Sequence, residues 1–379
     1  MPPHSPSRAA AFARATRRPA AQRSIAPPPH VKHSSEAALR KVSFKNYELE
    51  EWADLFVHRP LAHRLIQLIL ALRLPGLGLT PNHVTLCSLL AGWGAAAWMA
   101  EALIGGVLPA WHVAATVGNS RVAVHVLAAT LMLLSISLDC ADGQLARALG
   151  VSSPMGRFYD GLSDTLVIAS YCAVWCVAVL RLSGGSLVWY VAACAMCISL
   201  QQHFVLFDKV KIVYTLQTRP PSDRSKRNLT ACCDAADLAR RAAAASAAGE
   251  RGQAFAYRCA VAYAKSLAID VGNPMYQNRT LTDATRAEIT RTMRLLSFLG
   301  TGTHLLLWYV CIAACGVAPW CWKAFLLFQL TAVNAFDAYT RSRCVALKLH
   351  AGSYSEWTSS LPFVALGVLL PFIFGRYAQ

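Results

Sequence analysis

The chain has 379 residues, of which 55% are hydrophobic and 15% are charged, with a net charge of +16. Its apolar residues gather in blocks long enough to cross a bilayer, which excludes an ordinary water-soluble protein. A nucleic-acid binder would explain the basic charge but not the apolar blocks, whereas attraction to anionic lipid headgroups fits both features.

The N-terminal segment, residues 1–40, is rich in Arg, Pro, Ala and Ser and carries no acid before Glu36. Such a composition cannot build a hydrophobic core, so we predict a disordered basic segment. The alternative is a mitochondrial presequence, in which residues 9–18 would form a short basic helix. Pro19 and the prolines at 27–29 would end that helix early.

Residues 41–78 are predicted to form an amphipathic helix that lies at the membrane surface before the first span. The alternative is a helix packed on the long loop later in the chain. Thr80 is a candidate N-cap and Pro81 a first-turn proline, and together they open the first span. The apolar stripe of the surface helix consists of Leu55, Phe56, Leu61, Leu65, Leu68, Ile69 and Leu72.

The apolar blocks predict an all-α, polytopic helical bundle with about six to seven membrane spans. The sixth block contains Gln329, Asn334 and Asp337, so a helix that lines a cavity is the alternative for it. The predicted spans are residues 82–104, 122–146, 157–182, 186–207, 293–315, 319–340 and 357–375.

The Lys and Arg residues concentrate before the first span, in the loop 208–291 and at 341–348. The alternate connections are nearly uncharged, so the positive-inside bias predicts that the N-terminus and the loop are cytosolic. Arg121 and Arg181 fall at the other face and count against this orientation. The loop shows no catalytic pattern, and we interpret it as an elaboration.

Most of the 13 cysteines lie in the predicted spans, where cysteine behaves as a small apolar residue. Cys194 and Cys197 have the spacing of a CxxC pair, but the pair lies inside an apolar segment with no second pair nearby. We therefore expect neither a disulfide framework nor a metal at these cysteines.

Four aspartates lie at the ends of the second and third spans, on either side of a short turn. On a helix with about 3.6 residues per turn, Asp139 and Asp142 share one face, and Asp160 and Asp164 form a stripe on the next helix. If the two helices pack antiparallel, the two pairs face each other at the same level. Ionisable groups this close to a bilayer are costly and persist where they bind something.

Four clustered carboxylates cannot all stay ionised on their own, so the cluster demands cations. Oxygen ligands without His or Cys favour Mg²⁺ or Mn²⁺ over zinc. Cations beside Arg147 suit a pyrophosphate, and one carboxylate is left to accept a proton from a nucleophile. Gly143 and Gly156 let a flat ligand approach the backbone. The alternative, salt bridges to Arg147 and Arg157, leaves at least two acids unpaired.

This pattern resembles the signature of the CDP-alcohol phosphatidyltransferase family (class I), D-x2-D-G-x2-A-R-x8-G-x3-D-x3-D. Asn82, between Pro81 and Thr85 at the start of the first span, strengthens the resemblance, which covers roughly residues 79–182. The matching positions are Asp139, Asp142, Gly143, Ala146, Arg147, Gly156, Asp160 and Asp164.

The resemblance implies a membrane enzyme of phospholipid synthesis that displaces CMP from a CDP-linked donor with an alcohol hydroxyl. It makes residues 79–207 the catalytic membrane core, followed by the loop 208–291 and C-terminal membrane helices at 292–379. It also implies a homodimer in the lipid bilayer, while the apolar blocks argue against a nucleic-acid partner.

The resemblance further implies a role for each motif residue. Two metal ions, Mg²⁺ or Mn²⁺, would be held by the aspartates, and Asp164 would complete the metal site and act as the catalytic base. Gly143 and Gly156 would lie near the cytidine. Arg147 would contact the donor phosphates, and Asn82 would touch the donor. The metal ligands implied are Asp139, Asp142, Asp160 and Asp164.

The residues that follow the third and fourth aspartates do not identify the substrate. The aminoalcohol phosphotransferases of this family place a His after the third aspartate, where this chain has Gly161. Phosphatidylglycerophosphate and phosphatidylinositol synthases place a basic residue after the fourth, where this chain has Thr165. Length and extra spans favour an ethanolamine or choline phosphotransferase that uses diacylglycerol. The surroundings of the motif slightly favour a CDP-diacylglycerol donor and a polar alcohol.

Asn334, Asp337 and Arg341 stand at i, i+3 and i+7 and are predicted to line an acceptor pocket. The alternative is a polar contact between helices. An ion-coupled transporter is the competing function, but the acids sit together near one face and no inverted repeat is visible. The expected location is the endoplasmic reticulum or another endomembrane, with the mitochondrial inner membrane as the alternative.

Overall fold

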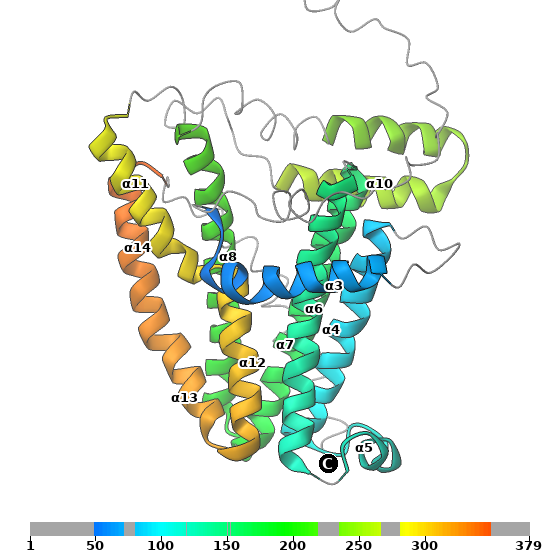
Figure 1. Cartoon of the computed structure of the whole chain (residues 1–379), viewed down its shortest axis with the longest axis vertical. Coiled ribbons are helices and arrows are strands. Elements are labelled where there is room, and N and C mark those ends of the chain that lie inside the picture. Colours follow the sequence, from blue (N-terminus) through cyan, green and yellow to red (C-terminus); the bar gives the residue numbers. More distant parts are fainter. Residues whose placement is uncertain are drawn as a thin grey trace, which may run out of the picture. The chain divides into compact units, whose positions relative to one another are not determined.

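A computed structural model describes residues 49–71, 80–118, 120–149, 151, 153–218, 235–266 and 281–349. The regular structure of these residues is entirely helical (Figure 1), which confirms the predicted all-α class. The predicted disordered segment at 1–40 and the seventh predicted span at 357–375 lie outside the described residues.

Five helical segments of the described chain are long and apolar enough to cross a membrane, and each overlaps one of the first five predicted spans. The last of them is interrupted by a short 3-10 turn. The segments are α4 (Pro81–Ile104), α6 (Arg121–Leu149), α7 (Pro154–Leu182), α8 (Leu187–Thr218) and the pair α11 (Asp283–Leu296) and α12 (Thr301–Val317), joined by η4 (Ser297–Leu299).

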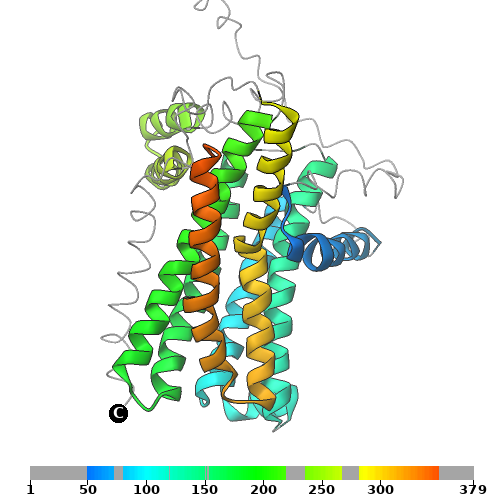
Figure 2. The same cartoon turned by 90° about the vertical axis from the view of Figure 1, so that its left-hand side faces the viewer.

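The sixth predicted span is a helical rod that lies beside α11 and α12 (Figure 2). It comprises α13 (Cys321–Phe328), a turn of π-helix, η5 (Gln329–Val333), and α14 (Asn334–Ala346). The Asn334 amide donates to the carbonyls of Leu330 at 3.1 Å and Gln329 at 3.3 Å. A side chain that bonds to the helix backbone in this way is a recognised cause of a local bulge.

An aromatic cluster fills the interior between α7, α12 and α13. The ring of Trp175 meets those of Trp308 at 5.8 Å and Phe325 at 5.5 Å, both edge to face. Because such rings bury large areas with a preferred geometry, they fix the spacing of these helices.

Small residues allow α4 to approach α6 and α7 closely. Ser88 and Ser135 each donate to the other's carbonyl, at 2.8 and 2.9 Å. A Cβ on Gly92 would stand 2.5 Å from Val167, so only glycine fits there. Tight packing over small side chains is how membrane helices associate without a hydrophobic driving force. Here it ties α4 to both helices that carry the aspartates.

A π-helical turn, η2 (Asp54–His58), continues into α3 (Arg59–Ala71), which lies across α6 (Figure 1). Ala62 and Ile66 are its buried contacts with α6. The predicted apolar stripe is half-buried or exposed where its side chains are described, with Phe56 65% exposed. That exposure favours contact with a membrane surface, and the interfacial role stays a prediction.

Glu51 precedes η2 and connects this N-terminal segment to the start of α12. Its carboxylate accepts from the Thr303 backbone N–H at 3.1 Å and lies where a side chain on Gly300 would stand. Burial is the main reason that the pKa of Glu51 lies well above its ordinary value, and the nearby Asp54 raises it further. The glycine therefore makes room for a buried acid at the α12 N-terminus.

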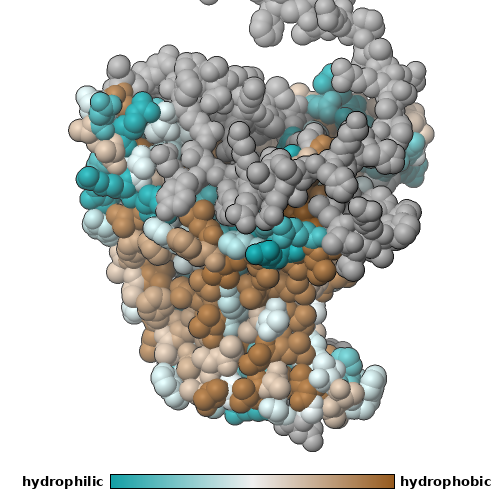
Figure 3. Space-filling model, in the orientation of Figure 1, coloured by the Kyte–Doolittle hydropathy of each residue, from teal (hydrophilic) through white to brown (hydrophobic). Residues whose placement is uncertain are grey.

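Hydropathy divides the surface of the bundle into two zones (Figure 3). Brown, apolar residues cover the part of the helices below α3, and teal residues gather above it. The helix at 235–247 and α10 (Arg251–Ser266) lie at this polar end, close to the start of α7, whereas the short helix α5 (Ala110–Val117) lies at the opposite end (Figure 1). We call the end that carries α10 the polar end of the bundle.

Candidate active site

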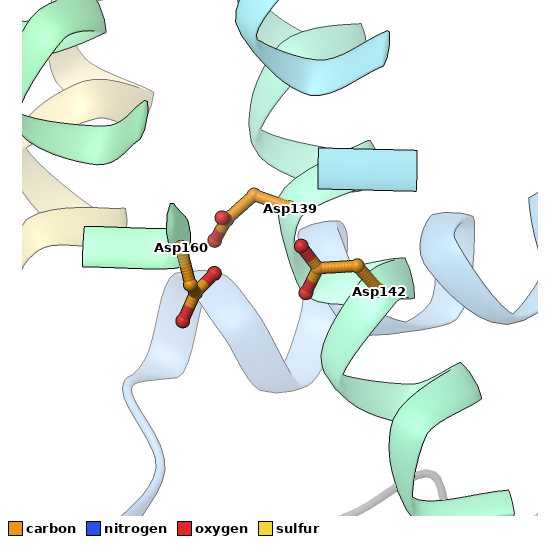
Figure 4. A group of neighbouring side chains, drawn as sticks. All are labelled: Asp139, Asp142 and Asp160. Carbon is orange, nitrogen blue, oxygen red and sulfur yellow. The ribbon is translucent and has the colours of Figure 1, made fainter. Parts of the chain in front are cut away.

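Three of the four predicted aspartates meet at the polar end of the bundle. Asp139 and Asp142 come from α6 and Asp160 from α7, and their carboxylates point toward one another (Figure 4). One oxygen of each lies within 4.8 Å of the others. We call these three residues the aspartate cluster.

The aspartate cluster depends on how α7 begins. The Ser153 hydroxyl accepts from the Gly156 backbone N–H at 2.9 Å and caps the helix, which starts at Pro154. Asp160 therefore stands in the second turn of α7. Contrary to the expectation from the sequence, the two aspartate helices do not pack extensively on each other; instead α4 contacts both of them.

The first turn of α4 is part of the same site. The Thr85 hydroxyl donates to Asp142 Oδ2 at 2.5 Å, and Thr85 is buried. Asn82 Oδ1 lies 3.6 Å from the position that a Cβ on Gly156 would occupy. The predicted donor residue Asn82 is thus next to the predicted cytidine glycine. Thr85 is a contact of the aspartate cluster that the sequence interpretation did not assign to the site.

Asp164 lies beside the aspartate cluster and not within it. Its carboxyl group is within hydrogen-bonding reach of Asp139, and the residue as a whole is exposed. Asp139 Oδ1, in contrast, is buried and has no hydrogen-bond partner among the described residues. A buried carboxylate oxygen without a donor is costly, and a bound cation would relieve that cost.

Arg147 bends back over the glycine at the end of α6. Its Nη1 lies 3.3 Å from the position of a Cβ on Gly143, and apart from the adjoining residues of α6 no other described atom comes within 4 Å of that position. The guanidinium therefore borders an open space beside Asp142, one residue before the glycine. This is the arrangement expected of an anion-binding group next to a metal site.

An unexpected residue, Tyr263, lies close to Gly161, which directly follows Asp160. The Tyr263 hydroxyl, from α10, occupies the space that a side chain on Gly161 would fill. Burial is the main reason that the pKa of Tyr263 rises to about 12, and the charges of Asp160, Asp164 and Asp208 raise it further. Sequence reasoning missed Tyr263 because it stands far along the chain in a loop without a recognisable pattern.

The predicted acceptor residues lie in a second polar cluster, between α8 and α14. Asn334 Oδ1 accepts from Ser199 Oγ at 2.5 Å and lies 3.2 Å from His203 Nε2. Arg341 Nη2 pairs with Asp337 at 3.2 Å. We call these five residues the asparagine network. Ser199 and His203 were not predicted, because their partners are more than a hundred residues away in sequence.

The aspartate cluster has the chemistry of a hard divalent-cation site. All of its donors are carboxylate oxygens, and among the residues that the structure describes no His or Cys belongs to it and one of its oxygens is buried without a partner. Mg²⁺ and Mn²⁺ prefer such oxygen donors. The residues present therefore fit the divalent metal that the motif implies.

Comparison with known proteins agrees with this chemistry. Residues 79–220 match the family model described as CDP-alcohol phosphatidyltransferase, which spans α4 to α8 and includes the aspartate cluster. No curated protein and no solved structure matches the chain. The reaction of the family is phosphatidyl transfer from a CDP-alcohol. Residues 79–220 are thus similar to a family of transferases, and they lie in a chain whose long apolar helices indicate an integral membrane protein.

Proposed function

We propose that the protein transfers a substituted phosphate from a CDP-linked donor to an alcohol and releases CMP. The observation that carries this proposal is the aspartate cluster, in which carboxylates from two helices converge beside Gly143 and Arg147. A dense set of acids next to an open backbone and a guanidinium suits a diphosphate held with divalent cations.

Each residue near the cluster has a distinct role in this proposal. Asp139, Asp142 and Asp160 would hold two ions, which when bound neutralise the charge that develops on the diphosphate. The Thr85 hydroxyl orients the Asp142 carboxylate. The Arg147 guanidinium binds the donor phosphate.

Asp164 is the proposed base because an acceptor alcohol can reach it and because it lies next to the aspartate cluster. It is exposed, so an acceptor hydroxyl can reach it, and its neighbour Asp139 belongs to the cluster. A base must lie within hydrogen-bond reach of the proton that it removes. Asp164 accepts the proton of the alcohol while it also completes the metal site.

For the donor we slightly favour CDP-diacylglycerol, with a polar alcohol as the acceptor. The residue after Asp160 is Gly161, and not the His of the aminoalcohol phosphotransferases, which supports this choice. The alternative is transfer of phosphoethanolamine or phosphocholine from a CDP-alcohol to diacylglycerol, which the length of the chain supports.

The test is a donor panel with the purified protein in lipid. One arm contains radiolabelled CDP-diacylglycerol with a series of polar alcohols, and the other contains CDP-ethanolamine or CDP-choline with diacylglycerol, each with Mg²⁺ or Mn²⁺. CMP release in the first arm supports CDP-diacylglycerol as the donor. CMP release in the second arm alone would instead show that the donor is a CDP-alcohol. Absence of CMP from both arms removes the enzymatic proposal.

Two variants control the panel. Asp164→Asn should abolish CMP release, because an amide cannot accept the proton. Asp237→Asn is the matched control, since Asp237 pairs with Arg240 and Arg241 on the surface of the helix at 235–247. It should retain wild-type release.

We also propose that the polar end of the bundle faces the cytosol of an endomembrane. The concentration of Lys and Arg before the first span and in residues 208–291 supports this orientation. Labelling of Cys259, on α10, by a membrane-impermeant thiol reagent in sealed microsomes tests it. Labelling before detergent is added supports a cytosolic α10, and labelling only afterwards reverses the orientation.

A further inference from the structure

The helix α10 packs on the first turns of α7, next to the aspartate cluster. Ala260 and Ala264 of α10 are buried in an apolar cluster with Phe158 of α7. The ring of Tyr263 meets the ring of Phe158 edge to face, with 5.9 Å between their centroids. These contacts fix the position of α10 against the helix that supplies Asp160.

The Tyr263 hydroxyl fills a gap that only glycine leaves. A Cβ on Gly161 would collide with the Tyr263 hydroxyl and would stand 3.1 Å from the ring carbon Cε2. The two residues are therefore a matched pair, in which the missing side chain at 161 makes room for a phenol from another part of the chain. Gly161 directly follows the metal-cluster residue Asp160.

Three carboxylates lie near enough to this phenol to interact with it electrostatically. Asp160 and Asp164 come from α7 and Asp208 comes from α8, and all three interact electrostatically with Tyr263. A neutral hydroxyl among negative groups serves as a hydrogen-bond donor and also offers lone pairs to a second hydroxyl. Tyr263 therefore lies beside the helix that supplies Asp160 and Asp164, whereas Arg147 lies beside Gly143 of α6.

We propose that Tyr263 is an acceptor-binding residue of this transferase, which holds the hydroxyl of the incoming alcohol against Asp164. The inference rests on the proposed function. It assigns a substrate contact to the long loop, which has no catalytic pattern of its own. The acceptor that it suits is an alcohol small or polar enough to lie between the phenol and Asp164.

The kinetic test compares Tyr263→Phe with wild type in the CMP-release assay. Loss of one hydrogen bond should raise the acceptor KM about tenfold, while the donor KM stays unchanged. Tyr257→Phe, on the same helix, is the matched control and should leave both constants unchanged. An unchanged acceptor KM in Tyr263→Phe, or an equal rise in the donor KM, overturns the proposal.

Gly161→Ala tests the matched pair independently. The added methyl would displace the Tyr263 hydroxyl, so this variant should reproduce the raised acceptor KM. In a Tyr263→Phe background the same change should add little, because the hydroxyl is already gone. Effects that multiply in the double variant would show that the two residues act separately and would contradict the proposal.

A cross-linking arm separates this inference from the proposed function. Benzoylphenylalanine placed at 263 should cross-link on illumination to the α7 peptide that contains Phe158 and Gly161. Failure to cross-link there overturns the position of Tyr263, whatever the activity. If the benzoylphenylalanine variant cross-links at that peptide but the wild-type protein releases no CMP in either donor arm, the proposed function is removed, and the acceptor role with it.

Discussion

The aspartate cluster and the asparagine network are both groups of buried and half-buried polar residues within a helical bundle, yet their internal chemistry differs. In the aspartate cluster the neighbours carry like charge, and Asp139 Oδ1 has no partner among the described residues. In the asparagine network Asn334 accepts from Ser199 and donates to the backbone of η5.

The difference shows which cluster needs something from outside the protein. Like charges held together are unfavourable unless a cation joins them, so the aspartate cluster is organised for a ligand. Donors and acceptors that satisfy one another stabilise the contact between helices and need no ligand. Burial alone therefore does not distinguish a site from a scaffold, and the pairing of the buried atoms does.

The largest expected effect is on catalysis by Asp160→Asn. Removal of one carboxylate from the cluster should lower the rate of CMP release by on the order of 10³-fold, because metal-based stabilisation of charge is worth several kcal/mol. Asp237→Asn is again the control. Activity within tenfold of wild type would mean that the cluster is not the metal site.

Metal binding should also appear in stability. Addition of Mn²⁺ to the chelator-treated protein should raise the midpoint of thermal unfolding, since saturation to 100 times the Kd contributes about 2.7 kcal/mol. Asp139→Asn should lose most of this shift, whereas Asp337→Asn, in the asparagine network, should keep it. Equal shifts in both variants would erase the distinction between the two clusters.

A change in the asparagine network should lower the stability of the protein more than its rate of CMP release. Asn334→Leu removes the acceptor of Ser199 and the amide that bonds to η5, and should lower the unfolding free energy by about 1–2 kcal/mol. CMP release at a temperature where the variant is folded should remain close to wild type. A catalytic loss comparable to that of Asp160→Asn, without a loss of stability, would make the network part of the active site.

The smallest expected effect concerns Asp337, which is still predicted to line an acceptor pocket. If Asp337 lines that pocket, Asp337→Asn should raise the acceptor KM several-fold, because the variant loses one hydrogen bond to a charged group. The pairing of Asp337 with Arg341 at 3.2 Å is the competing role for this carboxylate. An unchanged acceptor KM removes Asp337 from the site.

Local patterns in the sequence were sufficient to predict the first five spans and the faces that carry the aspartates. Helical periodicity placed Asp139 with Asp142, and the apolar blocks placed α4, α6 and α7 to within a few residues. These features depend on neighbours in the chain. The fold class and the family followed from them.

Long-range packing supplied what the sequence could not. Nothing near Tyr263 in the sequence indicates that its hydroxyl reaches Gly161, and nothing near His203 indicates that it meets Asn334. Gly161 was noticed only as a departure from the pattern of related enzymes. In the structure this glycine leaves room for the phenol of Tyr263, a contact that depends on the packing of α10 against α7.

The most direct test of the central claim is the metal dependence of CMP release by the purified wild-type protein. We predict CMP with Mg²⁺ or Mn²⁺, none after treatment with a chelator, and recovery when the ion is restored, with no recovery in Asp160→Asn. Release of CMP that persists in chelator would contradict the assignment of the aspartate cluster as the metal centre of this transferase.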